Sequence, residues 1–324
     1  MSFKIRLANG KEFICEEGES ILLSAQRNDI YLANSCINGR CGACMSKVVS
    51  GESSEIQSEI YSLHDGEILT CCRTAKTDMV LDIKETRKLP DQITSPCKIN
   101  KLELLKKDIM RVELRLPPSS NFIFLPGQHV ILKKTGIAER SYSIANGLFT
   151  DNKLILIIKN YQNGIFSDYL FNKAKINDLL IIDGPRGSFN LDISKVKKKL
   201  LFFATGTGIA PINSMLEELF ASGQNRHFDS IKLFWGNRSF NDFYHDELSI
   251  LDKIDLFLCT SREEESEQNF SGYVQEVASN FNTNFNDYEI YGCGSESMIE
   301  SLKRILTDKG YNLDHFHYDA FVVS

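Results

Sequence analysis

Apolar and polar residues alternate at the start of the chain, and this alternation predicts a β-hairpin. The run from Phe3 to Leu7 leads to Asn9-Gly10, a pair that favours the tight turn between antiparallel strands, and a second extended run follows. Ser20 then provides the N-cap of a short helix that we expect to end at Asn28. The chain therefore opens with a hairpin and one helix.

The middle of the chain is a series of short apolar runs separated by turns. Examples are Arg111 to Leu116, His129 to Lys133 and Leu154 to Lys159. Because no long helical periodicity appears among them, we expect a six-stranded antiparallel β-barrel.

The last part of the chain alternates buried-strand patterns with helical ones. Strands are expected at Lys199 to Ala204, Ile231 to Trp235, Leu256 to Thr260 and Glu289 to Tyr291. Strands that alternate with helices form a parallel sheet. The predicted fold class is therefore multidomain, with α+β parts followed by an α/β part.

The same patterns predict three domains, at residues 1–92, 93–194 and 195–324. The first closes near a strand at Met79 to Ile83. The stretch LPDQITSP, residues 89–96, is the expected linker because proline and polar residues interrupt both strands and helices.

The charge balance excludes some partners. The 324 residues carry a formal net charge of −6, with a pI near 5.6, which argues against a nucleic-acid partner. No apolar run reaches the roughly 18 residues of a membrane span. A soluble cytoplasmic protein in reducing surroundings is expected, and disulfides are not.

Four cysteines have the spacing of an iron–sulfur ligand set. Cys36, Cys41 and Cys44 are separated by four and then two residues, and Cys71 follows further along. This is the ligand spacing of a plant-type 2Fe-2S cluster. Small residues keep the loop narrow, so that backbone N–H groups can point at the cluster sulfurs. A zinc site would favour a second spaced pair, and here only the adjacent Cys71 and Cys72 follow.

Only one of these adjacent cysteines is expected to reach the cluster, since neighbouring side chains of an extended segment point to opposite faces. We choose Cys71 because it follows Leu-Thr, where ferredoxin-like sequences carry their fourth ligand. Most of the other cysteines are expected to be small buried residues; they are Cys15, Cys72, Cys97, Cys259 and Cys293.

A polar motif in the predicted barrel suits a flavin. Arg140-Ser-Tyr-Ser143 offers a guanidinium for a pyrophosphate, and its Tyr142 and Ser143 can contact the ribityl chain and the ring edge. Alone, the tetrapeptide also fits an ordinary polar strand. The flavin interpretation depends on its place between the cysteine segment and the motif that comes next. His129 is expected to be a barrel residue near the flavin without a role in proton transfer.

A glycine turn follows the first strand of the last part. Thr205-Gly-Thr-Gly-Ile-Ala-Pro211 leads into an amphipathic helix and forms a phosphate cradle, because free N–H groups and the helix dipole face the turn. It is not the Gly-x-Gly-x-x-Gly fingerprint, so alone it does not establish a dinucleotide site. A second turn, Gly292-Cys-Gly-Ser295, ends another strand at the edge where parallel sheets bind ligands.

Two further features of this part have alternative interpretations. Cys293 can lie beside the nicotinamide C4 atom, or it can be a small buried residue at a tight turn. His315 and His317 alternate with aromatic residues, as in a final strand, and we expect them to be packing or surface residues.

Taken in order, these motifs resemble the ferredoxin-NADP⁺-reductase superfamily with an N-terminal 2Fe-2S domain, over essentially the whole chain. Within it, the chain is most similar to the CDP-6-deoxy-Δ3,4-glucoseen reductases. The stretches that carry this similarity are GEILTCCRTAKTDMVLDI, SPCKI, LRLPPSSNFIFLPGQHV, RSYSIAN, NGIFS, GPRGSF and HYDAFVVS. The resemblance implies a β-grasp ferredoxin domain, an FAD-binding barrel and an NAD(P)-binding domain.

The resemblance also implies an activity and the residues for it. Such proteins take a hydride from NADH onto FAD and pass electrons singly through the cluster to a pyridoxamine-phosphate dehydrase that holds a sugar intermediate. The implied FAD contacts are Arg140, Tyr142, Ser143, Lys159, Gly164, Phe166 and Ser167. The implied nicotinamide contacts are Thr205, Gly206, Thr207, Gly208, Pro211, Ser261, Arg262, Cys293 and Gly294, with Cys293 and Ser143 as candidate catalytic residues.

Two departures from the relatives affect these assignments. Ser261 and Arg262, with Tyr273, are typical of the 2′-phosphate pocket of NADPH enzymes, whereas the carboxylates Glu263 to Glu265 would repel that phosphate. NADH and NADPH therefore both stay open, with NADH slightly favoured by the overall resemblance. Lys159 replaces an arginine that is usual near the flavin phosphates. Lysine keeps the positive charge but lacks the forked guanidinium that can donate two parallel hydrogen bonds.

Two other functions use the same modules. The chain can be the reductase component of a multicomponent oxygenase, or a non-enzymatic redox carrier or sensor. Turnover of NAD(P)H with an artificial acceptor would exclude the sensor. Charge patterns in the sequence do not identify the surface that docks a partner. The two reductase functions are therefore separated by adding each partner enzyme in turn.

Overall fold

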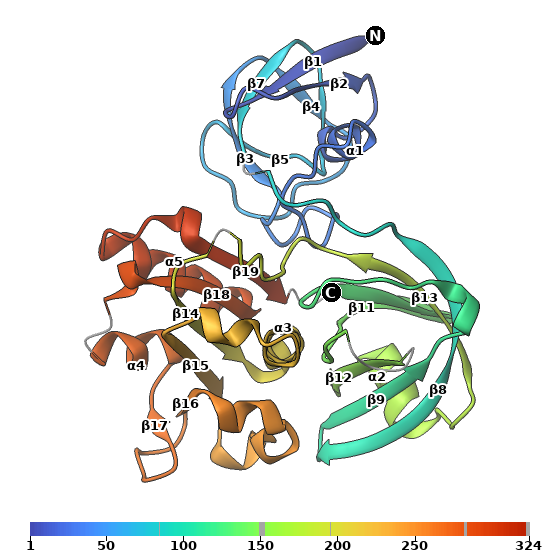
Figure 1. The fold of residues 1–324 in the computed structure, drawn as a ribbon. Helices are drawn as coiled ribbons and strands as arrows, with labels where there is room; N and C mark the ends of the chain where they lie inside the picture. Colours follow the sequence, from blue (N-terminus) through green and yellow to red (C-terminus); the bar gives the residue numbers. More distant parts are fainter. Residues whose placement is uncertain (84, 149–152, 195, 282–283, 322–324) are drawn as a thin grey trace. The chain divides into compact units, whose positions relative to one another are not determined.

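The computed structural model describes residues 1–83, 85–148, 153–194, 196–281 and 284–321, so the last three residues of the predicted HYDAFVVS motif lie outside it. It divides into two compact units (Figure 1). Unit 1 contains Met1–Leu89 and Gly187–Phe189, and unit 2 contains Pro90–Arg186 and Asn190–Phe321. In these ranges no helix is long and apolar enough to cross a membrane.

Unit 1 has a β-grasp fold, built on a five-stranded sheet of order β2-β1-β7-β3-β5. The predicted hairpin and helix are confirmed, since β1 pairs antiparallel with β2 and Ser20 caps α1. The elements are β1 (Ser2–Leu7), β2 (Glu12–Glu16), α1 (Ile21–Arg27), β3 (Met45–Ser50), β4 (Ser53–Glu55), β5 (Glu67–Leu69), β6 (Arg73–Ala75) and β7 (Met79–Asp82).

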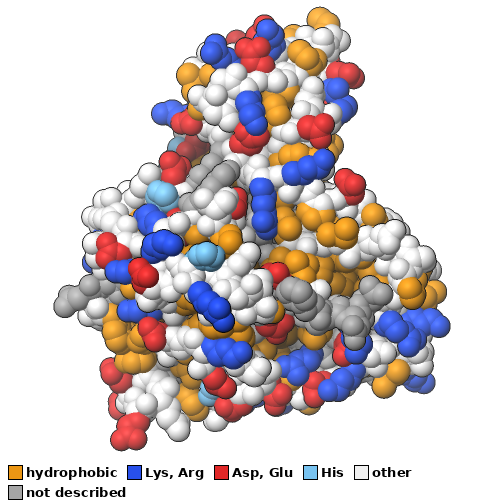
Figure 2. All heavy atoms as spheres, viewed as in Figure 1, with side chains coloured by type: hydrophobic (Ala, Val, Ile, Leu, Met, Phe, Trp, Pro, Cys, Tyr) orange, Lys and Arg blue, Asp and Glu red, His pale blue; other side chains and the backbone are white. Residues whose placement is uncertain are grey.

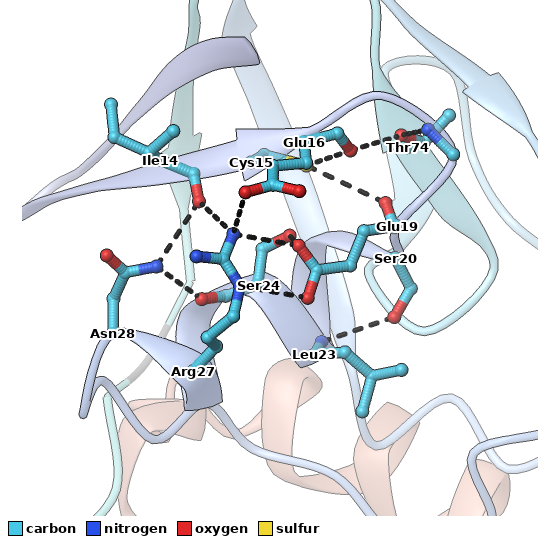
Figure 3. A network of polar contacts seen from close by, with 11 residues as sticks. Ile14, Cys15, Glu16, Glu19, Ser20, Leu23, Ser24, Arg27, Asn28 and Thr74 are labelled. Carbon is cyan, nitrogen blue, oxygen red and sulfur yellow. Dashed lines mark hydrogen bonds and ion pairs between the residues drawn. The ribbon is translucent and has the colours of Figure 1, made fainter. Parts of the chain in front are cut away.

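Polar contacts cap the start of α1 and fasten its end to the hairpin (Figure 3). The Ser20 hydroxyl accepts a hydrogen bond of 3.2 Å from a first-turn N–H, the usual role of an N-cap. At the other end, Arg27 binds the Glu19 carboxylate at 2.9 Å. Arg27 and Asn28 both donate to the Ile14 carbonyl on β2, each at 3.2 Å. These contacts fix the helix from which the cysteine loop departs.

The first part of unit 2 is an antiparallel six-stranded sheet of order β11-β10-β13-β8-β9-β12. It curls into a barrel, because its two edge strands meet through a bridge between Ile144 and Leu156 and a 2.8 Å bond from Ala145 N to Ile155 O. The elements are β8 (Ile93–Lys106), β9 (Ile109–Arg115), β10 (His129–Lys134), β11 (Ile137–Ser143), β12 (Lys153–Lys159), α2 (Ile165–Asn172) and β13 (Leu179–Arg186).

The second part of unit 2 is a parallel six-stranded sheet of order β17-β16-β15-β14-β18-β19. Side chains of Leu201 and Phe203 on β14 pack with those of α4 and α5 on one face, and α3 follows β14. The elements are β14 (Lys199–Thr205), α3 (Ile209–Ala221), β15 (Ser230–Asn237), β16 (Asp255–Thr260), β17 (Phe270–Ser271), α4 (Val274–Asn280), β18 (Tyr288–Ser295), α5 (Glu296–Asp308) and β19 (Phe316–Phe321).

Short 3₁₀ turns complete the connections. They are η1 (Pro118–Ser120), η2 (Gly206–Gly208), η3 (Gln224–His227), η4 (Phe240–Asp242), η5 (His245–Glu247), η6 (Ser249–Lys253), η7 (Phe285–Asp287) and η8 (Leu313–His315).

Two local predictions were wrong and most others are confirmed. The expected linker 89–96 is half strand, because β8 already begins at Ile93 and pairs with β13. The barrel also contains a helix, α2, where only strands and turns were expected. The expected strands of the barrel and the parallel sheet are present, and all five non-cluster cysteines are buried. The barrel and the parallel sheet share one compact unit, so the three domain boundaries stay a prediction.

Candidate functional site

The four candidate ligand cysteines come together in unit 1. Cys36, Cys41 and Cys44 lie on the loop between α1 and β3, and Cys71 lies in the turn between β5 and β6. The sulfurs of Cys44 and Cys71 are 3.3 Å apart, and the Cys36 and Cys41 thiols are hydrogen-bonded to each other. Each iron of a 2Fe-2S cluster takes two cysteine sulfurs. Two sulfur pairs are therefore a donor set that fits this cluster.

Backbone N–H groups of the loop point at these sulfurs. Those of Asn38, Arg40 and Cys41 donate to the Cys36 sulfur, and that of Gly39 donates to Cys71. Such bonds favour thiolate over thiol and help set the potential of a bound cluster.

The thiol pKa values follow the same pairing. Chiefly through the bond to Cys41, the pKa of Cys36 falls to about 5, while that of Cys41 rises. In the second pair the bond between the two thiols lowers the pKa of Cys44 and raises that of Cys71. In each pair one thiol thus has a lowered pKa, which favours the thiolate that an iron ligand must be.

Two glycines make the narrow loop possible. Gly39 has φ +77°, and a Cβ there would overlap the Ser58 carbonyl oxygen. Gly42 has φ +72°, and a Cβ there would lie 2.5 Å from the Tyr61 ring. Larger residues at either position would force the loop away from the segment that packs over it.

The adjacent Cys72 faces the segment that precedes β5. The expectation of an extended segment here was wrong, because residues 71 and 72 form a turn and their sulfurs lie 3.5 Å apart. The Cys72 sulfur contacts the Ser58 carbonyl at 3.8 Å and the Gln57 amide at 3.7 Å. Burial raises its pKa to about 12. Cys71 has the closer contact with Cys44, so we keep it as the predicted ligand.

In unit 2 the structure brings the two predicted flavin motifs together. Tyr142 on β11 packs edge-on against Phe166 of α2, with ring centroids 5.9 Å apart. Burial raises the pKa of the Tyr142 hydroxyl, which stays neutral. Arg140 lies on the same face of β11, and its Nη1 donates to the Glu139 carbonyl at 2.9 Å. Ser143 ends the strand and is buried.

The second flavin motif forms the start of α2. Gly164 precedes the helix, and the Ser167 hydroxyl donates to its carbonyl at 2.9 Å. A Cβ at Gly164 would lie 2.5 Å from the Ser167 oxygen, so a larger residue would displace this hydroxyl from its bond. Lys159, at the end of β12, forms an ion pair of 3.4 Å with Asp108, and the described contacts do not join it to Arg140.

The surface of the barrel part offers apolar area for a ring system. Figure 2 shows hydrophobic side chains gathered over this part of unit 2. Large apolar residues that are exposed here include Ile123, Leu148, Tyr161 and Ile165. Such area suits a flavin ring and its adenine better than it suits solvent.

His129 is buried on β10 opposite Ser143, and its imidazole is neutral. Burial, with Arg186 nearby, lowers its pKa to about 4.

A folded pKa of His129 below the ordinary 6.5 stabilises the fold above pH 6.5, and this stabilisation is lost as the pH falls toward 4. We expect a loss of about 3 kcal/mol across that window. His129→Gln should show a flatter decline in the thermal midpoint between pH 7 and pH 4.5, and identical declines would contradict the prediction.

The two predicted nicotinamide motifs meet where the strand order of the parallel sheet reverses. β14 lies between β15 and β18, with Ala204 paired to Cys293, so chain connections leave in opposite senses from neighbouring strands. Parallel sheets bind ligands at the carboxyl ends of such strands. Here the Thr205 hydroxyl accepts a 3.0 Å bond from Ser295 N–H, and a Cβ at Gly208 would overlap the Cys293 carbonyl.

Cys293 lies at this carboxyl edge, and its side chain is fully buried, as the second of the two alternatives predicted. Its place beside a nicotinamide ring stays a prediction. Burial, with the Asp319 carboxylate second, raises its thiol pKa well above the ordinary value. The Trp235 indole fixes the facing turn by donating to the Gly206 carbonyl at 3.0 Å. Cys293 thus presents a neutral thiol next to the glycine turn.

Ser261 and Arg262 follow the end of β16, and their main chain is hydrogen-bonded to the main chain at the end of β15. Their N–H groups donate to the carbonyls of Asn237 and Arg238, both at 3.1 Å. The Glu263 carboxylate binds the Ser239 hydroxyl and the Phe240 N–H, which lowers its pKa.

Sequence reasoning missed several residues of this region. Arg238 was missed because nothing in the sequence pairs it with Arg262. Asn213 and Ser214 of α3 lie in the predicted amphipathic helix and are buried, and the prediction gave neither of them a role. His315 and His317 were expected to pack or face solvent. They are half-buried and bind the buried Glu289 at 2.9 and 2.6 Å.

Three family models match successive stretches of the chain. The 2Fe-2S iron-sulfur cluster binding domain matches residues 6–76, the oxidoreductase FAD-binding domain residues 96–191 and the oxidoreductase NAD-binding domain residues 202–304.

Full-length relatives decide the family. The chain is 32% identical to the CDP-6-deoxy-L-threo-D-glycero-4-hexulose-3-dehydrase reductase of Yersinia pestis over 100% of both chains. It belongs to the family of these reductases. Protein RfbI of Salmonella typhimurium is 34% identical over 97% of this chain and 94% of its own. The 2-halobenzoate 1,2-dioxygenase electron transfer component of Burkholderia cepacia is 29% identical over 94% and 92%.

The fold is shared with a solved structure, the ferredoxin reductase in carbazole 1,9a-dioxygenase, at a TM-score of 0.71 and 24% identity over 99% of both chains. The chain is therefore an NAD(P)H-dependent iron–sulfur flavoprotein oxidoreductase, with 2Fe-2S, FAD and NAD-binding domains. The prediction of an electron-transfer reductase of this family is confirmed.

Proposed function

We propose that this reductase passes electrons to a pyridoxamine-phosphate-dependent CDP-4-keto-6-deoxyglucose 3-dehydrase in dideoxysugar biosynthesis. The observation that supports this acceptor is the end-to-end similarity to a dehydrase reductase, at 32% identity against 29% for a dioxygenase component. The acceptor would be met outside the membrane, in the cytoplasm.

The three cofactors divide the chemistry. A nicotinamide gives two electrons as a hydride, an iron–sulfur cluster takes one, and a flavin can do both. In our proposal Cys36, Cys41, Cys44 and Cys71 hold the cluster in a domain of residues 1–92. Domain 93–194 holds FAD and domain 195–324 holds the nicotinamide.

We assign the flavin to the joined β11 and α2 motifs. Arg140 would pair with its pyrophosphate, because the described contacts give the guanidinium no carboxylate partner. Tyr142 and Ser143 would contact the ribityl chain and ring edge. Gly164, Phe166 and Ser167 would face the phosphates from the start of α2, with Lys159 as a further cation; these contacts suit FAD's size and charge.

We assign the nicotinamide dinucleotide to the turn between β14 and α3. Gly206, Thr207, Gly208 and Pro211 would surround its phosphates, with Thr205 at the strand end. Cys293 and Gly294 would lie beside the nicotinamide ring, where a neutral thiol gives a small, weakly polar wall.

In our proposal, residues at the ends of β15 and β16 determine whether NADH or NADPH is the preferred hydride donor. Arg238 and Arg262 are both exposed, and their backbones are paired, so two guanidiniums are available for a 2′-phosphate. Glu263 is held by Ser239 and Phe240, whereas Glu264 and Glu265 are exposed and would repel that phosphate. The functional assay therefore offers both NADH and NADPH.

The test is anaerobic nicotinamide oxidation by the reconstituted protein with the dehydrase and its CDP-sugar. We expect oxidation that requires both additions and yields the 3-deoxy product, and omission of either is the control. If the nicotinamide reduces flavin and cluster but dehydrase and sugar add nothing, the proposed acceptor is wrong. The second candidate, an oxygenase component, would then lead, since dioxygenase electron transfer components are also full-length relatives.

A further inference from the structure

A polar stripe on α3 binds the main chain that follows β11. The stripe consists of Asn213, Ser214 and Glu217, and the bound segment is residues 145–147. The Asn213 amide donates to the Ala145 carbonyl at 2.7 Å, and the Ser214 hydroxyl donates to the Asn146 carbonyl at 2.6 Å. Gly147 N–H donates to the Glu217 carboxylate at 2.7 Å. Three successive residues of the segment are thus bound to one helix.

Asn213 and Ser214 of the stripe are buried, and the stripe is internally connected. Asn213 is 2% exposed, Ser214 0% and Asn146 1%. The Asn213 amide also donates to the second Glu217 oxygen, at 2.8 Å. Hydrogen bonds at such low exposure are strong, and their partners cannot be replaced by water. The segment therefore has little freedom to slide along the helix.

The helix and the segment also approach closely. A Cβ at Gly147 would lie 3.1 Å from both the Glu217 Cβ and the Glu218 N–H nitrogen, so a larger residue would separate them. The segment directly continues β11, which carries Arg140, and the helix directly continues the turn that starts at Gly206. The contact therefore joins the flavin-side strand to the nicotinamide-side helix.

Asn213 is polar although, among the residues that the structure describes, one of its own atoms is left unpaired. The Asn213 Oδ1 atom is buried and has no hydrogen-bond partner within the described ranges, which is unfavourable for the fold. An apolar residue here would remove that atom, but it would also remove the donor that the buried Ala145 carbonyl receives from Asn213. The polar residue is thus explained by its bond to the segment after β11.

We propose that Asn213, Ser214 and Glu217 are positioning residues that hold the strand carrying Arg140, Tyr142 and Ser143 at a set distance from the helix that begins at the glycine turn. The proposal rests on the flavin and nicotinamide assignments made above. Hydride transfer needs its reacting atoms about 3–3.5 Å apart, and a shift of about 1 Å costs about 100-fold in rate. Loss of the stripe should therefore slow transfer more than it weakens binding.

The test compares Asn213→Ala and Ser214→Ala with wild-type holoprotein. In each variant we expect flavin reduction by the nicotinamide to slow by about 10- to 100-fold. The dissociation constant of the oxidised nicotinamide, from calorimetry, should change less than about threefold, since the hydrogen bonds of the stripe described above go to residues 145–147. The long-wavelength charge-transfer absorbance of reduced flavin with oxidised nicotinamide, which reports ring stacking, should weaken.

Leu219→Ala is the matched control. Leu219 is buried on the same helix, so the variant should lower the thermal midpoint while it leaves the flavin reduction rate and the charge-transfer absorbance as in wild type. If a stripe variant does not fold, Glu217→Gln, at a partly exposed position, should show a smaller decrease of the same kind.

Unchanged rate and absorbance in the stripe variants would overturn the positioning role, and so would equal slowing in Leu219→Ala. A wild-type protein that neither nicotinamide reduces would overturn the assigned sites, and the positioning role would fall with them. Normal wild-type reduction with unaffected variants overturns the positioning role alone.

Discussion

Cys71→Ser is expected to remove the visible absorbance and the reduced-state electron paramagnetic resonance signal of the 2Fe-2S cluster. Electron transfer to a one-electron acceptor should fall by at least about 100-fold, because even the outer partners of metal ligands change affinity 10- to 100-fold. Nicotinamide reduction of the flavin should continue, since the flavin and nicotinamide motifs lie in the other unit. Absorbance spectra and iron content after reconstitution measure the effect.

Cys72→Ala is the control for this experiment. Its sulfur is 3.5 Å from that of Cys71, so both variants disturb the same turn, but only Cys71 lies 3.3 Å from Cys44. A normal cluster in Cys71→Ser together with its loss in Cys72→Ala would show that the fourth ligand was chosen wrongly.

Gly208→Ala is expected to reduce nicotinamide-dependent flavin reduction by about 100-fold, the cost of a displacement of about 1 Å. A Cβ at this position would overlap the main-chain carbonyl of Cys293, which cannot move aside as a flexible side chain can. The glycine turn and the Cys293 turn must therefore separate. Chemical reduction of the flavin and cluster by dithionite should remain, and stopped-flow absorbance separates the two routes.

Gly310→Ala provides the comparison for Gly208→Ala. Gly310 has φ +68° and open space around it, so alanine there introduces backbone strain without a collision. We expect a lower thermal midpoint and an ordinary rate of flavin reduction. Equal rates in the two variants would mean that the close approach of the two turns is not needed for the reaction.

The sequence predicted the sheets better than the irregular segments. Alternation along β1 and the buried run of β14 leave no other way to cover apolar residues, so both strands were predictable. Helix α2 was not, because it has only eight residues and starts at Gly164 without a side-chain cap. The turn at Cys71 was also missed, since two adjacent cysteines carry no signal of backbone direction.

In the candidate site, too, local motifs were easier to predict than contacts between distant segments. Motifs that depend on main-chain geometry, such as the turn at Gly206 and the cysteine loop, could be found in the sequence because their glycines mark tight turns. The contacts between segments were not readable. Asn213 and its partner Ala145 are separated by 68 positions, and only the folded chain shows that they touch.

The separation of the two nicotinamide-side regions has a consequence for how such proteins diverge. The turn that would face the ring lies on β14 and β18 and accepts no side chain at Gly208, whereas Arg238 and Arg262 lie on the exposed ends of β15 and β16. Under the proposed assignment, mutations in the second region would exchange one donor for another without touching the first. Donor preference would then be free to drift among descendants of this chain while the hydride chemistry is inherited unchanged.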